Sequence, residues 1–298
     1  MTDQSQCLWT ARRRFSVRAA CCLSFVAILA AATTAFAQQR PLTTEDPETV
    51  PSGRVLIEGG FDYSRSMEYP ASGLEGNLLR VPLVGVSVGI SSIAELQLDG
   101  GLHNGLAITS RDPSAPLAGM MTVRGDSTSS IEDLVVGTKI RILSERPGRP
   151  SFALRFATKL PNASNESGLG LDTMDFSLTG LVAKTVKSVR LVFNGGLGTL
   201  SDPIHGDSQN DVLTLGGSFA RALTDAFEFV GEANGRIDTS NGDAPPGTES
   251  RGLFRLGARY TVGAWRADAA VFFGLTSRDP SVGVAAGFTY VFNAFTLP

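Results

Sequence analysis

The residues of this chain that can do chemistry are mainly charged side chains at even spacings. Glu228 and Glu232 lie four positions apart, and Arg251, Arg255 and Arg259 repeat that interval further along. A β-strand sends successive side chains to opposite faces, so residues at even spacing share one face. Two such strands side by side would form a surface that carries both signs of charge. The chemistry of such a surface is electrostatic selection of solutes, with no bond made or broken.

Residue types that serve catalysis or metal binding are scarce. The two histidines, His103 and His205, both fall in predicted loops, and neither belongs to a recognisable nucleophile motif. Asp202, Asp207 and Asp211 lack the spacing of a calcium loop with its closing Glu. We therefore expect no catalytic residues, no metal site and no cofactor.

The first 37 residues have the pattern of a secretory signal peptide. Four arginines within residues 12–18 precede an apolar stretch, Ala19 to Ala32, and Ala35-Phe36-Ala37 forms a cleavage site before Gln38. All three cysteines lie in this segment, so the mature chain would have none. That composition excludes a disulfide framework, a thiolate metal site and a cysteine nucleophile.

The charge balance of the mature chain limits its partners. Removing residues 1–37 takes away four Arg and one Asp and leaves 22 basic and 28 acidic residues. An exported acidic chain is a poor binder of nucleic acid. The mature part also has no apolar run long enough for a membrane helix. If it spans a membrane it must do so as a closed barrel, because only a barrel then satisfies every backbone group in lipid.

The mature chain after residue 52 contains twelve segments with strand-like alternation. Most have about the 9–11 residues that a membrane strand needs, or slightly more. They cover residues 53–64, 77–90, 92–102, 130–143, 150–160, 172–184, 187–200, 210–222, 226–238, 250–263, 264–275 and 281–292.

The links between these segments alternate in length. Tight links lie at 91–92, 144–149, 185–186, 223–225 and 263–264, and mostly longer ones at 65–76, 103–129, 161–171, 201–209, 239–249 and 276–280. Short periplasmic turns and longer extracellular loops are the outer-membrane arrangement. The sequence predicts an all-β fold: a closed antiparallel transmembrane barrel of about 12 strands over residues 53–292. A periplasmic lead-in, 38–52, precedes it and a tail, 293–298, follows. A β-sandwich is the alternative for any single strand, but it fits the whole set less well.

The alternation assigns one apolar face to lipid and one charged face to the lumen. Phe227 and Phe229, for example, alternate with Glu228 and its even-numbered neighbours. The predicted lumen-lining residues nearly balance in sign. They are Glu58, Asp62, Glu95, Asp99, Asp133, Lys139, Arg141, Arg155, Lys159, Arg190, Glu228, Glu232, Arg236, Asp238, Arg251, Arg255, Arg259, Arg266 and Asp268.

Hairpin closure predicts which of these residues meet. A symmetric loop at 239–249 would place Asp238 opposite Arg251, and Asn234 opposite Arg255 with Glu232 nearby. The tight turn at Gly263-Ala264 would place Arg259 opposite Arg266. Such a ladder would form a constriction, or equally a network that fills and rigidifies the lumen.

Three local features carry further expectations. Pro82 interrupts the second strand and predicts a bulge, because proline cannot donate to the strand ladder. The length of the 103–129 loop suggests a segment that folds inward and narrows the pore. Phe288, Tyr290 and Phe292 alternate on the last strand and resemble the C-terminal signature that the outer-membrane assembly machinery reads. An aromatic girdle at the membrane interface explains them equally well.

Several short motifs are spread over most of the mature chain. They are Arg40 to Pro47 (RPLTTEDP), Pro51 to Arg54 (PSGR), Asp133 to Lys139 (DLVVGTK), Pro150 to Arg155 (PSFALR) with Lys159 to Pro161 (KLP), and Gly168 to Gly170 followed by Asp175. With these motifs the chain resembles the outer-membrane transporter family named for the MetA pathway of phenol degradation. The resemblance implies an outer-membrane barrel that takes up small, often apolar or aromatic compounds, and it supplies no catalytic residues.

These observations predict a monomeric porin-like channel in a Gram-negative outer membrane, through which small solutes diffuse passively. Its expected partners are outer-membrane lipid, the assembly machinery and a small solute that the sequence does not identify. The first alternative is a closed barrel with a structural or surface-binding role. The weaker alternative is a lipase-like barrel enzyme with a Ser/His pair.

Overall fold

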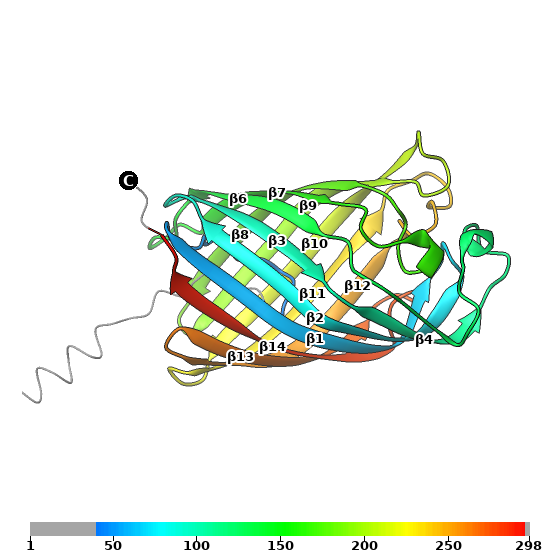
Figure 1. The fold of residues 1–298 in the computed structure, drawn as a ribbon. Coiled ribbons are helices and arrows are strands. Elements are labelled where there is room, and N and C mark those ends of the chain that lie inside the picture. The colour runs from blue at the N-terminus through cyan, green and yellow to red at the C-terminus, as the bar shows by residue number, and fades with distance from the viewer. Residues whose placement is uncertain (1–39, 296–298) are drawn as a thin grey trace, which may run out of the picture. The chain divides into compact units, whose positions relative to one another are not determined.

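The computed structural model describes residues 40–295, and the predicted signal peptide and the last three residues of the tail lie outside them. The described chain forms one closed antiparallel sheet. Its first strand, β1 (Arg54–Tyr69), pairs both with β2 (Leu74–Gly89) and with the last strand, β14 (Val282–Asn293). Because the first and last strands meet, the sheet closes on itself and the predicted barrel is confirmed (Figure 1).

Fourteen strand segments build a wall of twelve strands. β3 (Ala94–Gly101) and β4 (Asn104–Arg111) pair with successive parts of β2, so they are two halves of one strand interrupted at residues 102–103. β5 (Ser127–Ser130) and β6 (Val135–Leu143) pair with β4 and β3 and form the next strand in the same way. The other strands are β7 (Ser151–Lys159), β8 (Asp175–Val186), β9 (Val189–Ser201), β10 (Gln209–Ala222), β11 (Phe227–Asp238), β12 (Arg251–Val262) and β13 (Trp265–Gly274).

The break between β3 and β4 lies opposite Pro82. The amide of Leu102 donates to the carbonyl of Pro82, and the amide of Val81 donates to the carbonyl of His103. On the other side of β2, the register with β1 shifts between Gly60 and Asp62. The bulge that the sequence predicts near Pro82 is therefore confirmed. Pro82 thus lies between a strand break on one side of β2 and a register shift on the other.

Two predicted loops are shorter than expected. The predicted loop at 65–76 reduces to a turn at 70–73, because β1 and β2 both extend to it. The predicted loop at 103–129 was also too long, because β4 and β5 continue the wall and leave only residues 112–126. Leu106 of β4 packs inside the barrel against Leu74 and Leu78, a tertiary contact that short-range pattern does not reveal.

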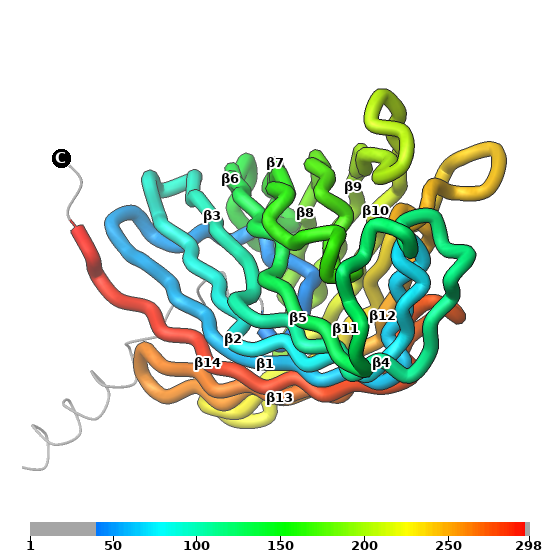
Figure 2. Tube along the Cα trace, turned by 45° about the vertical axis from the view of Figure 1, so that its right-hand side comes forward, coloured from blue at the N-terminus to red at the C-terminus, as the bar shows by residue number. Residues whose placement is uncertain are grey.

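Residues 112–126 dock on the rim. The short helix η1 (Ala118–Met120) lies in this loop. The amide of Leu117 donates to the carbonyl of Ala71, and the amide of Thr122 donates to the carbonyl of Glu166, next to the short helix η2 (Asn165–Ser167). Figure 2 shows this loop at the same end of the barrel as the loops after β9 and β11. The short turns lie at the opposite end, where β14 also ends (Figure 1).

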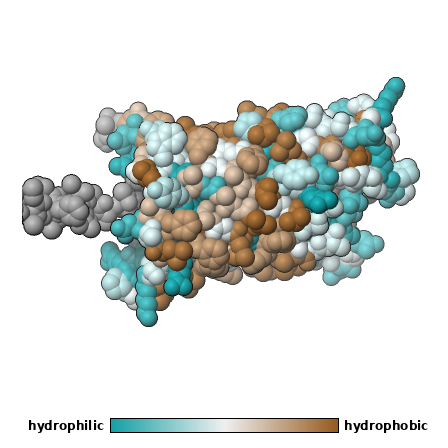
Figure 3. Space-filling model, turned by 90° about the horizontal axis from the view of Figure 1, so that it is seen from below, coloured by the Kyte–Doolittle hydropathy of each residue, from teal (hydrophilic) through white to brown (hydrophobic). Residues whose placement is uncertain are grey.

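The outer surface of the wall is apolar. Tyr260, Trp265 and Phe229 face outward and are substantially exposed. Figure 3 shows the hydrophobic residues gathered over the middle of the barrel, with hydrophilic residues towards its two ends. This distribution matches an apolar band in contact with lipid. No helix within residues 40–295 has the length and apolar character needed to cross a membrane.

Candidate functional site

Residues 40–50 of the predicted lead-in, here called the N-terminal segment, lie inside the barrel. Leu42, Glu45 and Val50 are each at most 5% exposed. The amides of Thr43 and Thr44 donate to the Glu232 carboxylate of β11 at 2.9 and 2.7 Å. This polar segment has neither a helical nor a strand period, so its burial was not predictable from the sequence pattern.

Further hydrogen bonds tie the same segment to other parts of the wall. The Glu45 amide donates to Oδ1 of Asn194 on β9 at 2.6 Å, and Nδ2 of Asn194 returns a bond to the Glu45 carbonyl at 2.8 Å. Nε of Arg259 on β12 donates to the carbonyl of Arg40 at 2.9 Å. The Val50 amide donates to the Glu95 carboxylate on β3. The segment is thus anchored to strands on several sides of the lumen.

Three carboxylates of the N-terminal segment pair with bases of the wall. These three carboxylates were not among the predicted lumen residues. Glu45 lies 3.3 Å from Nζ of Lys139 and 2.8 Å from Nε of Arg155. Asp46 lies 2.7 Å from Arg190, and Glu48 lies 2.5 Å from Arg141.

These ion pairs set the protonation of the segment. Burial alone would raise the pKa of the Glu45 carboxyl, but Lys139 and Arg155 outweigh burial and hold that pKa below its usual value. Burial likewise opposes ionisation of Asp46, and hydrogen bonds from Arg190 lower its pKa overall. Both groups are therefore charged at neutral pH.

The wall adds its own ion pairs among the predicted lumen residues. Most of those residues have an oppositely charged partner inside the barrel, so the ladder is largely compensated. Their role in selecting solutes stays a prediction. The pairs are Lys139 with Glu95 at 2.9 Å, Arg255 with Glu232 at 2.6 Å, Lys159 with Asp133 at 3.0 Å, Arg155 with Asp99 at 3.7 Å, Arg266 with Glu58 at 3.8 Å, and Arg259 with Glu228 at 4.0 Å. Asp268 instead lies 3.8 Å from Arg40 of the N-terminal segment.

The predicted hairpin registers were wrong. Arg251 lies opposite Arg236 instead of Asp238, because the loop after β11 does not close symmetrically. Asp238 instead accepts hydrogen bonds from Asn210 and Ser240 at the end of its strand.

The two other predicted cross-strand partners also changed. Arg255 lies opposite Glu232, which shifts the pairing by two residues from the predicted Asn234. Arg259 lies opposite Asp268 instead of Arg266. Val262 of β12 pairs with Trp265 of β13 across the two-residue turn at 263–264, and this pairing sets the register of the rest of the hairpin.

Two further charged residues of the lumen were missed. Arg80 of β2 pairs with Asp62 of β1, and it also lies 2.9 Å from Glu132. Arg80 belongs to the strand whose face assignment Pro82 made ambiguous, and Glu132 follows the short strand β5. Only the alternation of inward and outward residues along β2 could have predicted that Arg80 faces the lumen, and Pro82 interrupts that alternation.

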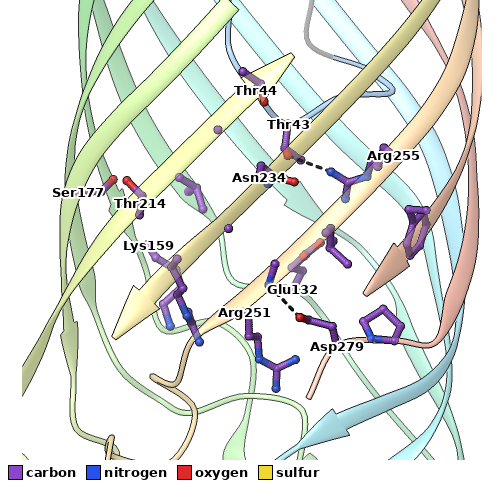
Figure 4. Close-up of a pocket in the computed structure, with 18 of the residues that line it drawn as sticks. Thr43, Thr44, Glu132, Lys159, Ser177, Thr214, Asn234, Arg251, Arg255 and Asp279 are labelled. Atoms are coloured by element: carbon purple, nitrogen blue, oxygen red, sulfur yellow. Dashed lines mark hydrogen bonds between the residues drawn. The ribbon is translucent and has the colours of Figure 1, made fainter. Parts of the chain in front are cut away.

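A larger and a smaller cavity lie among the described residues inside the barrel, and the N-terminal segment borders both. The larger has a volume of about 710 Å³ and reaches the ends of β1 and β12 on the long-loop side. The smaller has a volume of about 380 Å³ and is lined by Arg40, Glu58 and Gly85. Thr43 and Arg255 line both cavities, and Figure 4 shows these two side chains joined by a hydrogen bond.

The histidines lie apart from these cavities. Both side chains are exposed, and Nδ1 of His205 lies 3.1 Å from the Asp202 carboxylate. The Ser208 hydroxyl donates to Asp202 and to the backbone of His205. Within residues 40–295 no serine hydroxyl is hydrogen-bonded to a histidine ring, and no group of three or more potential metal ligands is found.

The aromatic residues of the last strand gather on the outside of the barrel near the short-turn end. The ring of Tyr290 stacks on Trp265 with centroids 4.2 Å apart, and on Phe292 at 5.5 Å. Phe288 lies 6.1 Å from Trp265. The cluster has the position expected of an interfacial girdle. Recognition of these residues by the assembly machinery stays a prediction.

Known structures resemble this barrel in fold. The outer membrane channel COG4313 from Pseudomonas putida F1 is 13% identical, with a TM-score of 0.58 over 83% of this chain and 98% of that chain. The KdgM porin, solved in complex with disordered oligogalacturonate, is 11% identical with a TM-score of 0.48 over 80% and 99% of the two chains. The NanC porin is 11% identical with a TM-score of 0.47 over 82% and 100%. At these identities the likeness concerns the fold alone.

Comparison by sequence gives the family. No curated protein matches the chain. The family model described as "Putative MetA-pathway of phenol degradation" matches residues 38–292, which include the N-terminal segment and the whole barrel. The chain therefore belongs to this family of outer-membrane-type β-barrels.

Proposed function

We propose that the protein is an outer-membrane channel for passive diffusion of small solutes, apolar and aromatic compounds among them. A signal peptide, residues 1–37, would export it, and its apolar band would contact outer-membrane lipid. The supporting observation is the pair of cavities that meet at Thr43 and Arg255 inside the barrel. A solute that passes between them moves along a surface of paired charges. The family description and the fold of the COG4313 channel agree with this proposal.

The test is ion and solute flux through the purified protein. We expect discrete current steps in a planar bilayer and uptake of small aromatic solutes by vesicles that contain the barrel. The conductance should be small, because the N-terminal segment occupies part of the cross-section. A protein that migrates as a folded barrel on an unboiled gel but gives neither current nor flux would refute the proposal.

A closed barrel is the second candidate, and the burial of residues 40–50 favours it. In that case the segment would stay docked and the barrel would serve as a scaffold for its outer loops. The two candidates differ in the wild-type protein. The closed barrel conducts only after the segment is removed, whereas the channel conducts with the segment present.

The pH dependence of conductance reports on the same segment. Glu45 and Asp46 have lowered pKa values when the segment is docked, so docking is fully favoured above their ordinary values. It weakens progressively as the pH falls from these ordinary values, 4.5 and 3.8, through the lowered ones. We expect constant conductance from neutral pH down to about pH 5 and an increase below it. The variant Glu45→Gln/Asp46→Asn should lose this acid-induced increase, and an unchanged acid response in that variant would contradict the assignment.

A further inference from the structure

The larger cavity contains two arginines that lack the carboxylate partners found elsewhere in the lumen. Arg236 of β11 and Arg251 of β12, the arginine pair, lie directly opposite each other in register. Like charges in this arrangement destabilise a sheet. Among residues 40–295, no carboxylate oxygen lies within 4.0 Å of either guanidinium. Among the described residues, the arginine pair therefore lines the cavity without a direct ion-pair partner.

Backbone carbonyls fix both guanidinium groups in place. Arg236 donates to the carbonyls of Glu249 and Gly247 at 2.9 and 2.6 Å. Arg251 donates to the carbonyls of Arg278 and Glu68 at 2.9 and 2.7 Å. Carbonyls orient a guanidinium without neutralising it, so the groups are pre-organised to receive an anion.

The acids near the arginine pair are engaged elsewhere. Oε2 of Glu249 accepts from the Gly247 amide at 3.0 Å. Oδ2 of Asp279 accepts from the amides of Gly252 and Thr276, at 2.8 and 3.0 Å. Asp175 of β8 is paired with Lys159 at 3.1 Å. Figure 4 shows Arg251 and Asp279 close together in the lining of the larger cavity, which also includes Lys159 and Thr214.

A hydroxyl beside the pair also lacks a partner. Thr214 of β10 lies opposite Arg236 in register and lines the cavity, and its Oγ1 is buried without a hydrogen bond. Oδ1 of Asn234, two residues before Arg236 in β11, is buried and unbonded as well. Buried polar atoms are normally satisfied, so these atoms indicate a place where a bound molecule completes the hydrogen bonding.

Part of the cavity lining beside the arginine pair is apolar. Met67, Tyr69 and Leu169 pack around the buried Leu78, and all four line the cavity. Sδ of Met67 lies 3.9 Å from Nη1 of Arg251, so the apolar wall begins where the arginine pair ends. The cavity volume of about 710 Å³ is that of a small-molecule site. A molecule with an anionic group and a hydrocarbon body would fit the arginine pair and this apolar part of the lining together.

We propose that the cavity is a binding site for small carboxylates with an apolar body, held by Arg236 and Arg251 through the carboxylate and by the Met67–Leu169 wall through the hydrocarbon. Two fixed guanidinium groups match the two oxygens of a carboxylate. The Thr214 hydroxyl donates a further bond. The inference deepens the proposed channel function by naming a solute class, and it rests on that function only for the claim that the ligand goes on to cross the membrane.

Equilibrium binding to the mature protein in detergent micelles tests the site without any need for conduction. The probes are benzoate, acetate and benzyl alcohol, titrated calorimetrically against protein and against empty micelles. We expect saturable binding of benzoate, with much weaker binding of acetate, which lacks the hydrocarbon, and of benzyl alcohol, which lacks the charge. Equal binding of acetate and benzoate would overturn the proposal, because it would leave only an unspecific anion site.

Variants assign the binding to the arginine pair. Arg236→Gln/Arg251→Gln should weaken benzoate binding by about tenfold or more, as expected for loss of charge-assisted hydrogen bonds. The control Arg124→Gln makes the same change on an exposed outer loop and should bind as the wild type does. If the double variant does not show the folded gel shift, the single variant Arg251→Lys replaces it. A lysine keeps the positive charge but cannot form the bidentate hydrogen bonds of a planar guanidinium, so this variant should bind benzoate measurably more weakly. Unchanged affinity in the folded variant would overturn the proposal.

The two proposals fail in different ways. If the barrel binds benzoate through the arginine pair but carries no current, the binding site is supported and the channel is refuted. If the barrel conducts normally but binds benzoate independently of Arg236 and Arg251, the channel is supported and the binding site is refuted.

Discussion

Deleting residues 41–49 is expected to raise the single-channel conductance several-fold. The deletion removes the part of the N-terminal segment that runs between the two cavities and leaves β1 to β14 intact. The wall closes through its own strand pairing, so the barrel should still fold. With the segment gone, the cavities merge into one lumen, and current rises with the open cross-section. Planar-bilayer recording measures the increase, and vesicle swelling should show passage of sugars that the wild type excludes.

A milder variant tests the same mechanism with the chain length preserved. Glu45→Gln/Asp46→Asn/Glu48→Gln removes the charges that pair with Lys139, Arg155, Arg190 and Arg141. We expect frequent transitions to the large conductance, because the neutral segment leaves its site more often. The matched control, Asp126→Asn/Glu166→Gln/Asp243→Asn, removes three exposed loop carboxylates and should behave as the wild type does. If the deletion left conductance unchanged, the segment would not be the barrier.

Replacing Lys139 should give the largest loss of stability among single substitutions in the lumen. Its side chain is 1% exposed and lies between Glu95 and Glu45, whose side chains are also buried. Lys139→Met leaves two carboxylates without their shared cation, and breaking a buried ion pair in this way costs about 3–5 kcal/mol. Urea unfolding in lipid vesicles measures the loss. Glu95→Gln in the same chain should recover part of it, because the double variant removes one of the unpaired charges.

An exposed pair provides the comparison. Lys184 lies 3.3 Å from Glu145 near a short turn, and its side chain is 33% exposed. Lys184→Met should cost no more than about 1 kcal/mol, as expected of a surface ion pair. Equal unfolding midpoints for the two variants would mean that the lumen around Lys139 is well hydrated, which would argue for a wider water path than the described cavities provide.

Period-two alternation was sufficient to predict the wall. It located all twelve strands because each strand has one face in lipid and one in a polar interior. It failed where a residue's environment depends on distant partners. Leu106 extends the wall through contacts with Leu74 and Leu78, and no local pattern marks that extension. Hairpin register failed for a related reason, since a shift of two residues keeps every side chain on its face and leaves the alternation unchanged.

The candidate site was predictable only in part. The inward charges were visible, but their partners were not, because three of the acids belong to a segment without any periodic signal. The arginine pair became apparent only once the observed register placed Arg236 opposite Arg251 in place of the predicted Asp238. Charge alternation therefore identifies which residues face the lumen. Whether each charge has an oppositely charged partner depends on contacts that only the tertiary structure determines.

The pairing of β1 with β14 has a consequence for the kinetics of folding. Arg54 lies opposite Asn293, so the ring cannot close until the last strand has been synthesised and delivered. Contacts between such distant parts of a chain form slowly, and until then both terminal strands have unpaired edges that are prone to aggregation. Arg40 donates to the carbonyl of Ala286 on β14 at 3.2 Å, across that same junction. The N-terminal segment can therefore complete its contacts only after the ring has closed, and its docking would mark the end of assembly.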